Sequence, residues 1–278
     1  MIRVLTGILG RLNSHREPSY RLSMPTQNFL ALDKIKSLSN PYWYHSIDFV
    51  DYLTPGHNWH NLWEWIAKFI SDNNRIFQGT DILEFGPQDG LWTAWMTKLG
   101  CRHISSVDIL NKPEFRLVCE AFDLPVEYYP SVTSSDTPRH VKKDFSGVAS
   151  LGVLYHLHDP LAALMMYRRF LRKGGWLLLE TAAVKGKTRA MYYTENGPLS
   201  GRSSGNIFYP TEGFLENALT EGLGFQIVDQ KFLVTGFSPA IRRLTGRLIL
   251  LAYVQTPPNI ANFEFVTESL GFKAPFEG

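Results

Sequence analysis

The stretch Asp81–Asp108, DILEFGPQDGLWTAWMTKLGCRHISSVD, decides the fold of this chain. It begins with the short apolar run Ile82–Phe85, which is typical of a buried strand in a parallel sheet. The glycine turn of residues 86–90 lets the backbone bend tightly and come close to a ligand. Apolar residues at helical spacing follow in residues 91–99, and a second apolar run ends in Asp108. This order of strand, turn, helix, strand and acid predicts a βαβ unit whose last carboxylate binds hydroxyl groups.

The turn separates two classes of nucleotide ligand. A dinucleotide fold has G-x-G-x-x-G, whose close glycines admit a pyrophosphate. This chain instead has E-x-G-x-x-x-G, formed by Glu84, Gly86 and Gly90. Acidic side chains around the turn repel phosphate but suit a ligand with an ammonium and a sulfonium group. An ordinary glycine turn with a solvated acid is the alternative, yet Asp108 follows at the expected distance of about 20 residues.

Size and composition favour a globular enzyme. The 278 residues suit one large α/β domain with or without an appendage, and a 44% hydrophobic content is enough for its core. The net charge of +2 does not by itself indicate a nucleic-acid partner. Cys101 and Cys119 are expected to be thiols in a reducing compartment, so we expect a cytoplasmic protein. No apolar run approaches the roughly 20 residues of a membrane helix, so we expect no integral membrane segment.

Weaker patterns predict the remaining elements. Helices are expected at residues 30–38, 57–70 and 161–171, and strands at residues 126–129, 145–154, 176–181, 224–233 and 248–255, the last two as an antiparallel pair. Lys173, Gly174 and Gly175 are expected to end the third of these helices. The strand ends then converge on one edge of the sheet, where ligands bind in open α/β folds.

The chain divides into three predicted parts. Residues 1–70 form an N-terminal helical and aromatic extension that caps the domain, residues 71–256 form the ligand-binding domain, and residues 257–278 form a tail. Residues 182–210 are too long for an ordinary loop and predict a lid-like insertion. The apolar face of residues 1–12 suits docking on the domain, pairing in a homo-oligomer, or contact with a membrane surface. We favour docking.

The glycine turn and Asp108 resemble motif I of the class I S-adenosylmethionine (SAM) methyltransferases. The resemblance implies a Rossmann-like, seven-stranded sheet with SAM as cofactor. It also implies that Glu84, Gly86 and Gly90 border the methionine part and that Asp108 binds the ribose. The full set of expected cofactor contacts is Trp59, Glu84, Gly86, Gln88, Gly90, Asp108, Ile109, Ser131, Val132 and Leu151, with Asp136 as a further candidate for the adenine amine.

Further motifs resemble one branch of that superfamily, the tRNA wobble-uridine carboxymethyltransferases. They are Gly152-Val153-Leu154-Tyr155-His156 with Asp159-Pro160, Gly174-Gly175 with Glu180-Thr181, and Asn206 with Tyr209-Pro210-Thr211. The branch uses a carboxylated SAM, whose extra charge needs cations. Residues 43–47 contain no lysine where the branch has one, and Glu64 replaces another. Arg242 and Arg243 are the candidates for the arginine of the branch, and we predict ordinary SAM and methyl transfer.

Methyl transfer is an in-line displacement in which the protein mainly positions the acceptor. A hydroxyl acceptor also needs a base, and His156 and His158 are the candidates; the alternative is that His156 only braces its loop. Tyr155 and Glu180 are expected to orient the acceptor. Substrate contacts are further expected from His45, Tyr193 and Tyr209, and no metal is expected, although Asp159 with Glu180 is a conceivable acid pair.

Three functions remain open from the sequence. The first is O- or N-methylation of a small molecule such as a sugar or secondary metabolite, which the low net charge and the long insertion favour. The second is tRNA modification, which needs a continuous basic face formed by Arg168, Arg169, Arg172, Lys185, Lys187 and Arg189. The third is a non-catalytic binding subunit, against which the intact set of Glu84, the two glycines and Asp108 argues.

Overall fold

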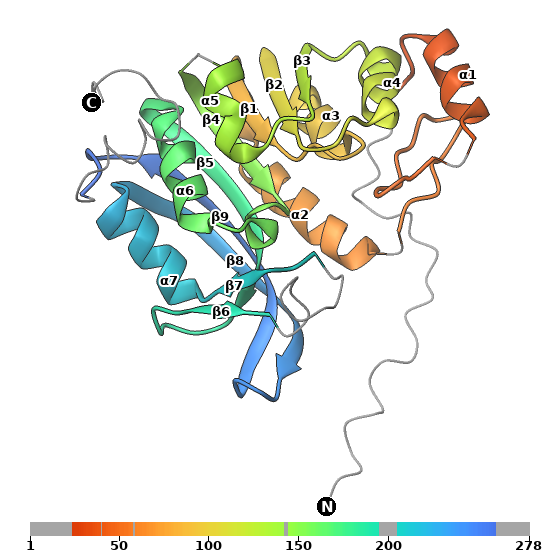
Figure 1. Cartoon of the computed structure of the whole chain (residues 1–278). Helices are drawn as coiled ribbons and strands as arrows, with labels where there is room; N and C mark the ends of the chain where they lie inside the picture. Colours follow the sequence, from red (N-terminus) through yellow and green to blue (C-terminus); the bar gives the residue numbers. More distant parts are fainter. Residues whose placement is uncertain (1–23, 40, 58, 142–143, 195–204, 260–278) are drawn as a thin grey trace, which may run out of the picture.

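The computed structural model describes residues 24–39, 41–57, 59–141, 144–194 and 205–259. Its centre is a seven-stranded sheet in the order β3-β2-β1-β4-β5-β9-β8 (Figure 1). The strands are β1 Asp81–Phe85, β2 His103–Asp108, β3 Val126–Pro130, β4 Phe145–Leu151, β5 Leu171–Val184, β8 Phe225–Ser238 and β9 Arg243–Val254. Strands β1 to β5 run parallel, and β9 is antiparallel to both β5 and β8. This confirms the predicted α/β fold, its seven strands and its antiparallel pair.

Alternating side chains of the strands build two cores, one on each face of the sheet. Ile82 and Ile104 face the core under the helices α1 Phe29–Ser37, α2 His60–Asp72, α3 Leu91–Lys98 and α4 Pro113–Phe122. Leu83 and Val107 face the core under α6 Pro160–Arg169 and α7 Glu212–Asn217 (Figure 1). Because successive strand residues point to opposite faces, the central strands are apolar on both sides, as a covered parallel sheet requires.

Several strand boundaries differ from the prediction. Strand β5 continues to Val184, β8 continues to Ser238 and β9 begins at Arg243. Strand β4 ends at Leu151, three residues early, because Gly152 takes a positive φ of 79° and the chain turns into the short 3₁₀ helix η3, Leu154–His156. Strand β5 begins at Leu171, directly after α6, so Lys173–Gly175 lie inside a strand and do not end a helix. Glycine can occur after the end of a helix or inside a strand. Here the pairing of Phe145 with Leu171 places these residues in a strand.

The N-terminal extension packs against the domain through α1 and α4. The backbone amides of Gln27 and Asn28 both donate to the carbonyl of Ala121 in α4. The rings of Phe49 and Phe122 stack with centroids 4.7 Å apart. The part of the extension from residue 24 onward is therefore joined to the same core as the central strands.

Two other predictions concern the chain ends and the insertion. Residues 1–12, with their expected docking face, and most of the predicted tail lie outside the described residues. Residues after β5 form the small antiparallel pair β6 Met191–Tyr193 and β7 Phe208–Pro210. No helix in the described part of the chain has the length and apolar character to cross a membrane.

Candidate active site

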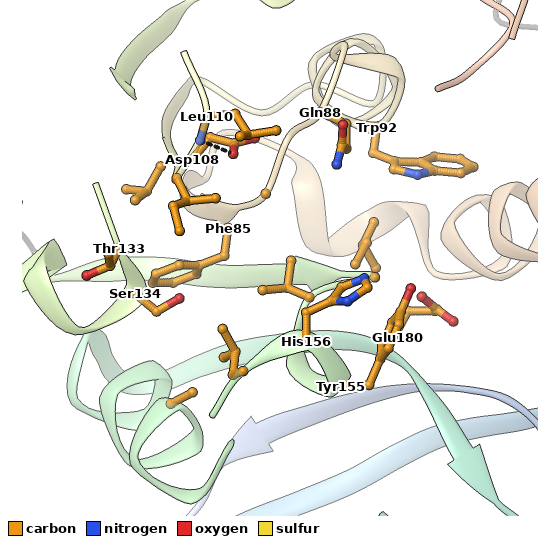
Figure 2. Close-up of a pocket in the computed structure, with 18 of the residues that line it drawn as sticks. Phe85, Gln88, Trp92, Asp108, Leu110, Thr133, Ser134, Tyr155, His156 and Glu180 are labelled. Atoms are coloured by element: carbon orange, nitrogen blue, oxygen red, sulfur yellow. Dashed lines mark hydrogen bonds between the residues drawn. The ribbon is translucent and has the colours of Figure 1, made fainter. Parts of the chain in front are cut away.

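A cavity of about 680 Å³ opens at the edge of the sheet where β1, β2 and β4 end, beside Glu180 of β5. Its volume lies within the range of about 300–1,000 Å³ that is ordinary for small-molecule sites. Figure 2 shows Asp108, Thr133 and Ser134 towards one side and Tyr155, His156 and Glu180 towards the other. We call these the Asp108 end (Asp108, Ile109, Leu110, Val132, Thr133, Ser134) and the Glu180 end (Tyr44, Trp63, Tyr155, His156, Glu180, Arg247).

Most of the residues expected from the sequence line this cavity. Those that do are His45, Gly86, Gln88, Asp108, Ile109, Val132, Leu151, Tyr155, His156, His158 and Glu180. Those that do not are Trp59, Glu84, Gly90, Ser131, Tyr193 and Tyr209. Lining the cavity is a matter of position, and the individual binding roles of these residues remain predictions.

Asp108 is placed to bind a polar group of a ligand. It ends β2, and its Oδ1 accepts a hydrogen bond of 2.8 Å from the amide of Leu110. Its Oδ2 is buried and has no hydrogen-bond partner in the protein. Burial raises the pKa of this carboxyl above its ordinary value, against the opposing effect of nearby amides and Lys112. A buried acceptor without a donor is costly, so a ligand hydroxyl at this point would stabilise it.

The glycine turn brings bare backbone to the middle of the cavity. Gly86 has a φ of 68°, and a Cβ there would lie 2.6 Å from Cγ2 of Val153. Gly90 has a φ of 94° and precedes α3, where a Cβ would meet the ring of Phe115 at 3.1 Å. Gly86 therefore leaves room for Val153 in the lining, whereas Gly90 lies outside the lining and leaves room for Phe115.

Glu84 is a structural residue and not a wall of the cavity. Only 3% of it is exposed, and its Oε2 accepts hydrogen bonds of 2.7 Å from Thr93 and from Ser106. Burial raises its pKa to about 7, although the two hydroxyls oppose the rise. The carboxyl joins β1 to α3 and β2 behind the turn, and its expected contact with a cofactor stays a prediction.

The second acid of the turn, Asp89, fastens the N-terminal extension to the domain. It is fully buried and accepts hydrogen bonds of 2.7 Å from the amides of Tyr44 and His45, and a further one from Nδ1 of His45. Burial would raise its pKa, but the interactions with His45 outweigh burial and hold the pKa below its usual range. Tyr44 and His45 both line the cavity, so Asp89 fixes one wall of it.

The tryptophan beside the cavity is Trp63 and not Trp59. Trp59 is 48% exposed and does not line the cavity, although its ring contacts those of Tyr44 and His57. Trp63, one helical turn later in α2, is buried and lines the cavity together with Trp92. The predicted helix began at residue 57 and therefore included Trp59, but α2 begins only at His60. Trp59 and Trp63 are four residues apart, so they lie on the same face at different heights along the helix axis.

A family comparison identifies the domain that contains this cavity. A model described as a methyltransferase domain matches residues 57–230, which is more than half of the chain. The chain belongs to this methyltransferase family. It contains the α/β fold of that family, and SAM is the cofactor to be expected of such an enzyme.

Individual relatives agree with this assignment. The tRNA U34 carboxymethyltransferase of Pseudomonas aeruginosa is 27% identical over 145 residues, which is 50% of this chain and 42% of that protein. The enzyme of the same name from Cellvibrio japonicus is 29% identical over 154 residues, covering 53% of this chain and 44% of that one. The matches therefore span less than half of the length of these relatives.

Solved structures show the same fold at low sequence identity. A SAM-dependent methyltransferase from Mesorhizobium loti has a TM-score of 0.50 and 16% identity, covering 66% of this chain and 97% of that one. The N-terminal domain of EvdMO1, solved in the presence of S-adenosylhomocysteine (SAH) and D-fucose, has a TM-score of 0.51 and 15% identity. That match covers 86% of this chain and all of the other, 100%.

The Asp108 end of this methyltransferase fits the adenosine part of SAM. The free Oδ2 of Asp108 suits a ribose hydroxyl, and Gly86 of the turn lines the cavity. The amide of Val132 donates to the carbonyl of Asp108, so this residue offers its side chain and not its N–H. Ser131, which has a φ of 58°, and Asp136, which is paired with Arg139 at 2.6 Å, lie outside the lining.

The Glu180 end contains an ion pair that the sequence did not reveal. Arg247 of β9 donates from Nε and Nη2 to the two carboxylate oxygens of Glu180, at 2.6 and 2.7 Å. Its guanidinium also lies 4.7 Å from the ring centre of Tyr155. Arg242 and Arg243, the arginines suggested from the sequence, are exposed and do not line the cavity. An arginine inside the apolar run of β9 was the available signal, because such a charge requires a buried partner.

His156 is held in one tautomer by Gly205, a residue of the insertion at residues 182–210. Its Nδ1 lies 2.7 Å from the carbonyl oxygen of Gly205, which can only accept, so Nδ1 must carry the proton. In the neutral ring Nε2 is then an acceptor. Burial lowers the pKa of His156, which favours this neutral form. The arrangement therefore leaves an unprotonated ring nitrogen at the Glu180 end, beside Tyr155, whose ring centre is 4.0 Å away.

The other expected catalytic and substrate residues have different surroundings. His158 lines the cavity and is exposed, as His156 is, and Asp159 caps α6 by accepting from the amide of Ala162 at 2.9 Å. Tyr193 in β6 and Tyr209 in β7 do not reach the lining. Within the described ranges no group of acidic, histidine or cysteine side chains is arranged to hold a metal ion.

Proposed function

We propose that this enzyme transfers the methyl group of SAM to an oxygen or nitrogen atom of a small molecule, with His156 as the base when the acceptor is a hydroxyl. SAM supplies the methyl group as part of a sulfonium. The acceptor oxygen forms a bond to carbon while the bond between carbon and sulfur breaks, and the hydroxyl proton passes to Nε2 of His156. The products are the methyl ether and SAH.

The proposal rests mainly on the tautomer of His156. A proton fixed on Nδ1 by Gly205 leaves Nε2 as the acceptor, and Figure 2 shows the ring among the lining residues. The ordinary pKa of histidine lies near neutrality, and its lowering here keeps the base form populated at neutral pH. Tyr155 and the Glu180–Arg247 pair lie on the same side and can orient the acceptor.

The surface supports a small acceptor over RNA. The basic face suggested by the sequence is interrupted, because Arg168 is only 2% exposed and donates to the backbone carbonyls of Leu223 and Thr256. Lys187 of the same set is paired with Glu216 at 2.7 Å. Removing these charges from the set weakens the expected attraction for a polyanion.

A second candidate function is carboxymethyl transfer to tRNA, as the names of the curated relatives describe for those proteins. Arg247 and Tyr155 favour it, since a cation and a phenol in the cavity could meet the carboxylate of carboxylated SAM. We still favour ordinary SAM for two reasons. Glu180 already neutralises Arg247. Where the branch has two lysines, this chain has no lysine in residues 43–47 and has Glu64 at the other position. Calorimetric titration with both forms distinguishes them, and clear preference for carboxylated SAM would refute our choice.

The acceptor class can be tested with labelled SAM. The enzyme is incubated separately with small metabolites and with RNA from the same extract, and label is expected in the metabolites. Changing His156 to Gln should lower the rate of transfer to a hydroxyl by about 10²- to 10⁴-fold. The affinity for SAH should remain, because His156 lies at the other end of the cavity from Asp108.

A matched control separates catalysis from general damage. His140, an exposed histidine in the short helix α5 Thr137–His140, does not line the cavity, and His140→Gln should leave the rate unchanged. Label that appears only in RNA would contradict the proposal, as would an unchanged rate for His156→Gln with a hydroxyl acceptor.

A further inference from the structure

The Glu180 end holds one full positive and one full negative charge, and these neutralise each other. The fork of Arg247 meets both oxygens of Glu180, whose exposed fraction is only 1%. Two parallel charge-assisted hydrogen bonds fix the geometry of the pair. The pair therefore offers donors and acceptors to a ligand but adds no net charge to this end.

The other polar groups of the Glu180 end are held in their uncharged forms. Burial raises the pKa of the phenols of Tyr44 and Tyr155 above the ordinary value for tyrosine. Burial lowers the pKa of His156. Neither a phenolate nor an imidazolium is thus favoured at neutral pH. What remains is a set of hydrogen-bonding atoms beside the aromatic rings of Tyr44 and Trp63, whose centres are 6.3 Å apart.

We propose that the Glu180 end binds an uncharged ring compound with hydroxyl groups, and that the Glu180–Arg247 pair makes it reject anionic relatives of the same compound. The inference rests on the proposed function and adds the class of acceptor to it. A hydroxyl donates to Glu180 or accepts from Arg247 while its ring lies against the aromatic side chains. A carboxylate or phosphate would lose its water and meet no cation that lacks a counter-charge at this end.

The charge of the pair can be changed in both directions. Glu180→Gln keeps the size of the side chain and leaves Arg247 as a net positive charge. Arg247→Met keeps much of the length and leaves Glu180 as a net negative charge. The double variant Glu180→Gln/Arg247→Met is uncharged again. Glu216→Gln is the matched control, because it makes the same substitution in an ion pair, with Lys187, that is outside the cavity.

Binding is measured on SAH-loaded protein by ligand-observed NMR, with neutral and anionic compounds of similar shape. Methyl glucoside is compared with glucuronate, and 4-hydroxyacetophenone with 4-hydroxybenzoate, so that the two arms distinguish a sugar from a phenol. Wild type and Glu216→Gln should bind the neutral member of at least one pair about tenfold more tightly, which corresponds to about 1.4 kcal/mol. The ratio of the affinity for the neutral compound to that for the anionic compound should fall by about tenfold in Glu180→Gln and rise in Arg247→Met. The double variant should restore the wild-type ratio.

Several results would overturn the inference. One is equal binding of neutral and anionic members by wild type, and another is no binding of either neutral compound while SAH is bound. A third concerns each single variant that retains a cooperative thermal transition. The inference fails if the preference for the neutral compound does not fall in Glu180→Gln, or does not rise in Arg247→Met. If both single variants lost that transition, an altered ratio in the folded double variant would count against the inference. Absence of SAH binding would contradict the proposed function instead, so the two failures are distinguishable.

Discussion

The two ends of the cavity are built in different ways. At the Asp108 end, Asp108 and Ile109 follow directly from the strand, turn, helix and strand that begin at Asp81. At the Glu180 end, the side chains come from the N-terminal extension, from η3, and from β5 and β9. Local backbone rules therefore encode one end, whereas sheet pairing assembles the other. Asp89 belongs by sequence to the first end and by its contacts to the second.

Breaking the link at Asp89 is expected to have the largest effect on stability. In Asp89→Ala the buried amides of Tyr44 and His45 lose their acceptor, and the side chain of His45 loses its partner. Removal of one member of a buried pair costs about 3–5 kcal/mol of unfolding free energy. The loss is measured by denaturant unfolding.

The control for this change lies in the same extension. Asp51 is exposed, and Asp51→Ala should change the unfolding free energy by no more than about 0.5 kcal/mol. In the folded fraction of Asp89→Ala, SAH binding should be weakened less than the unfolding free energy is lowered. If Asp89→Ala were as stable as Asp51→Ala, the extension would not depend on the turn and the comparison would fail.

The next effect concerns the Asp108 end alone. Asp108→Ala removes the free Oδ2 that we assign to the ribose, and hydrogen bonds to charged groups contribute about 1.5–3 kcal/mol each. SAH affinity measured by calorimetry should fall by about a hundredfold, at 1.4 kcal/mol for each factor of ten. Asp136→Ala, an acid outside the cavity, should leave the affinity unchanged. Equal effects of the two changes, or no effect of Asp108→Ala, would remove the basis for placing the ribose at this end.

A smaller effect distinguishes structure from binding at Glu84. Its pKa rises from the ordinary 4.5 to about 7 in the folded protein, so the folded state binds more protons than the unfolded state in this pH window. Stability should therefore fall as the pH rises from about 4.5 to 7, by roughly 3 kcal/mol, and stay lower above it. Glu84→Gln cannot ionise and should lack this slope. Denaturant unfolding across the window measures it, and an identical slope in the variant would show that other groups cause it.

The sequence predicted the Asp108 end more completely than the Glu180 end. The turn required positive φ at Gly86 and Gly90, and only glycine meets that requirement at low cost, so the pattern itself located the cavity. The lining of the cavity was less visible: Glu84 and Gly90 belong to the same pattern, yet neither lines the cavity. A motif fixes where the backbone goes, whereas the side-chain direction depends on which neighbours surround it.

At the Glu180 end, the register between β5 and β9 decided which arginine lines the cavity. Among three nearby arginines only Arg247 enters the cavity, because it lies opposite Ala182 and so beside Glu180, which pairs with Ile249. A shift of one residue would turn Arg247 to the other face of the sheet. At Trp59 and Trp63 the helix start mattered in a similar way, because Trp59 precedes α2 and only Trp63 lies within it.

By itself the sequence determined the βαβ unit, the tight glycine turn and the acid at its end, because these follow from the backbone preferences of neighbouring residues. Only the tertiary structure decided that Arg247 neutralises Glu180, that Gly205 fixes the tautomer of His156, and that Asp89 holds Tyr44 in the wall. Each of these joins segments far apart in the chain. Such contacts form only when sheet order and register bring the segments together, and no local pattern in a single sequence records that distance.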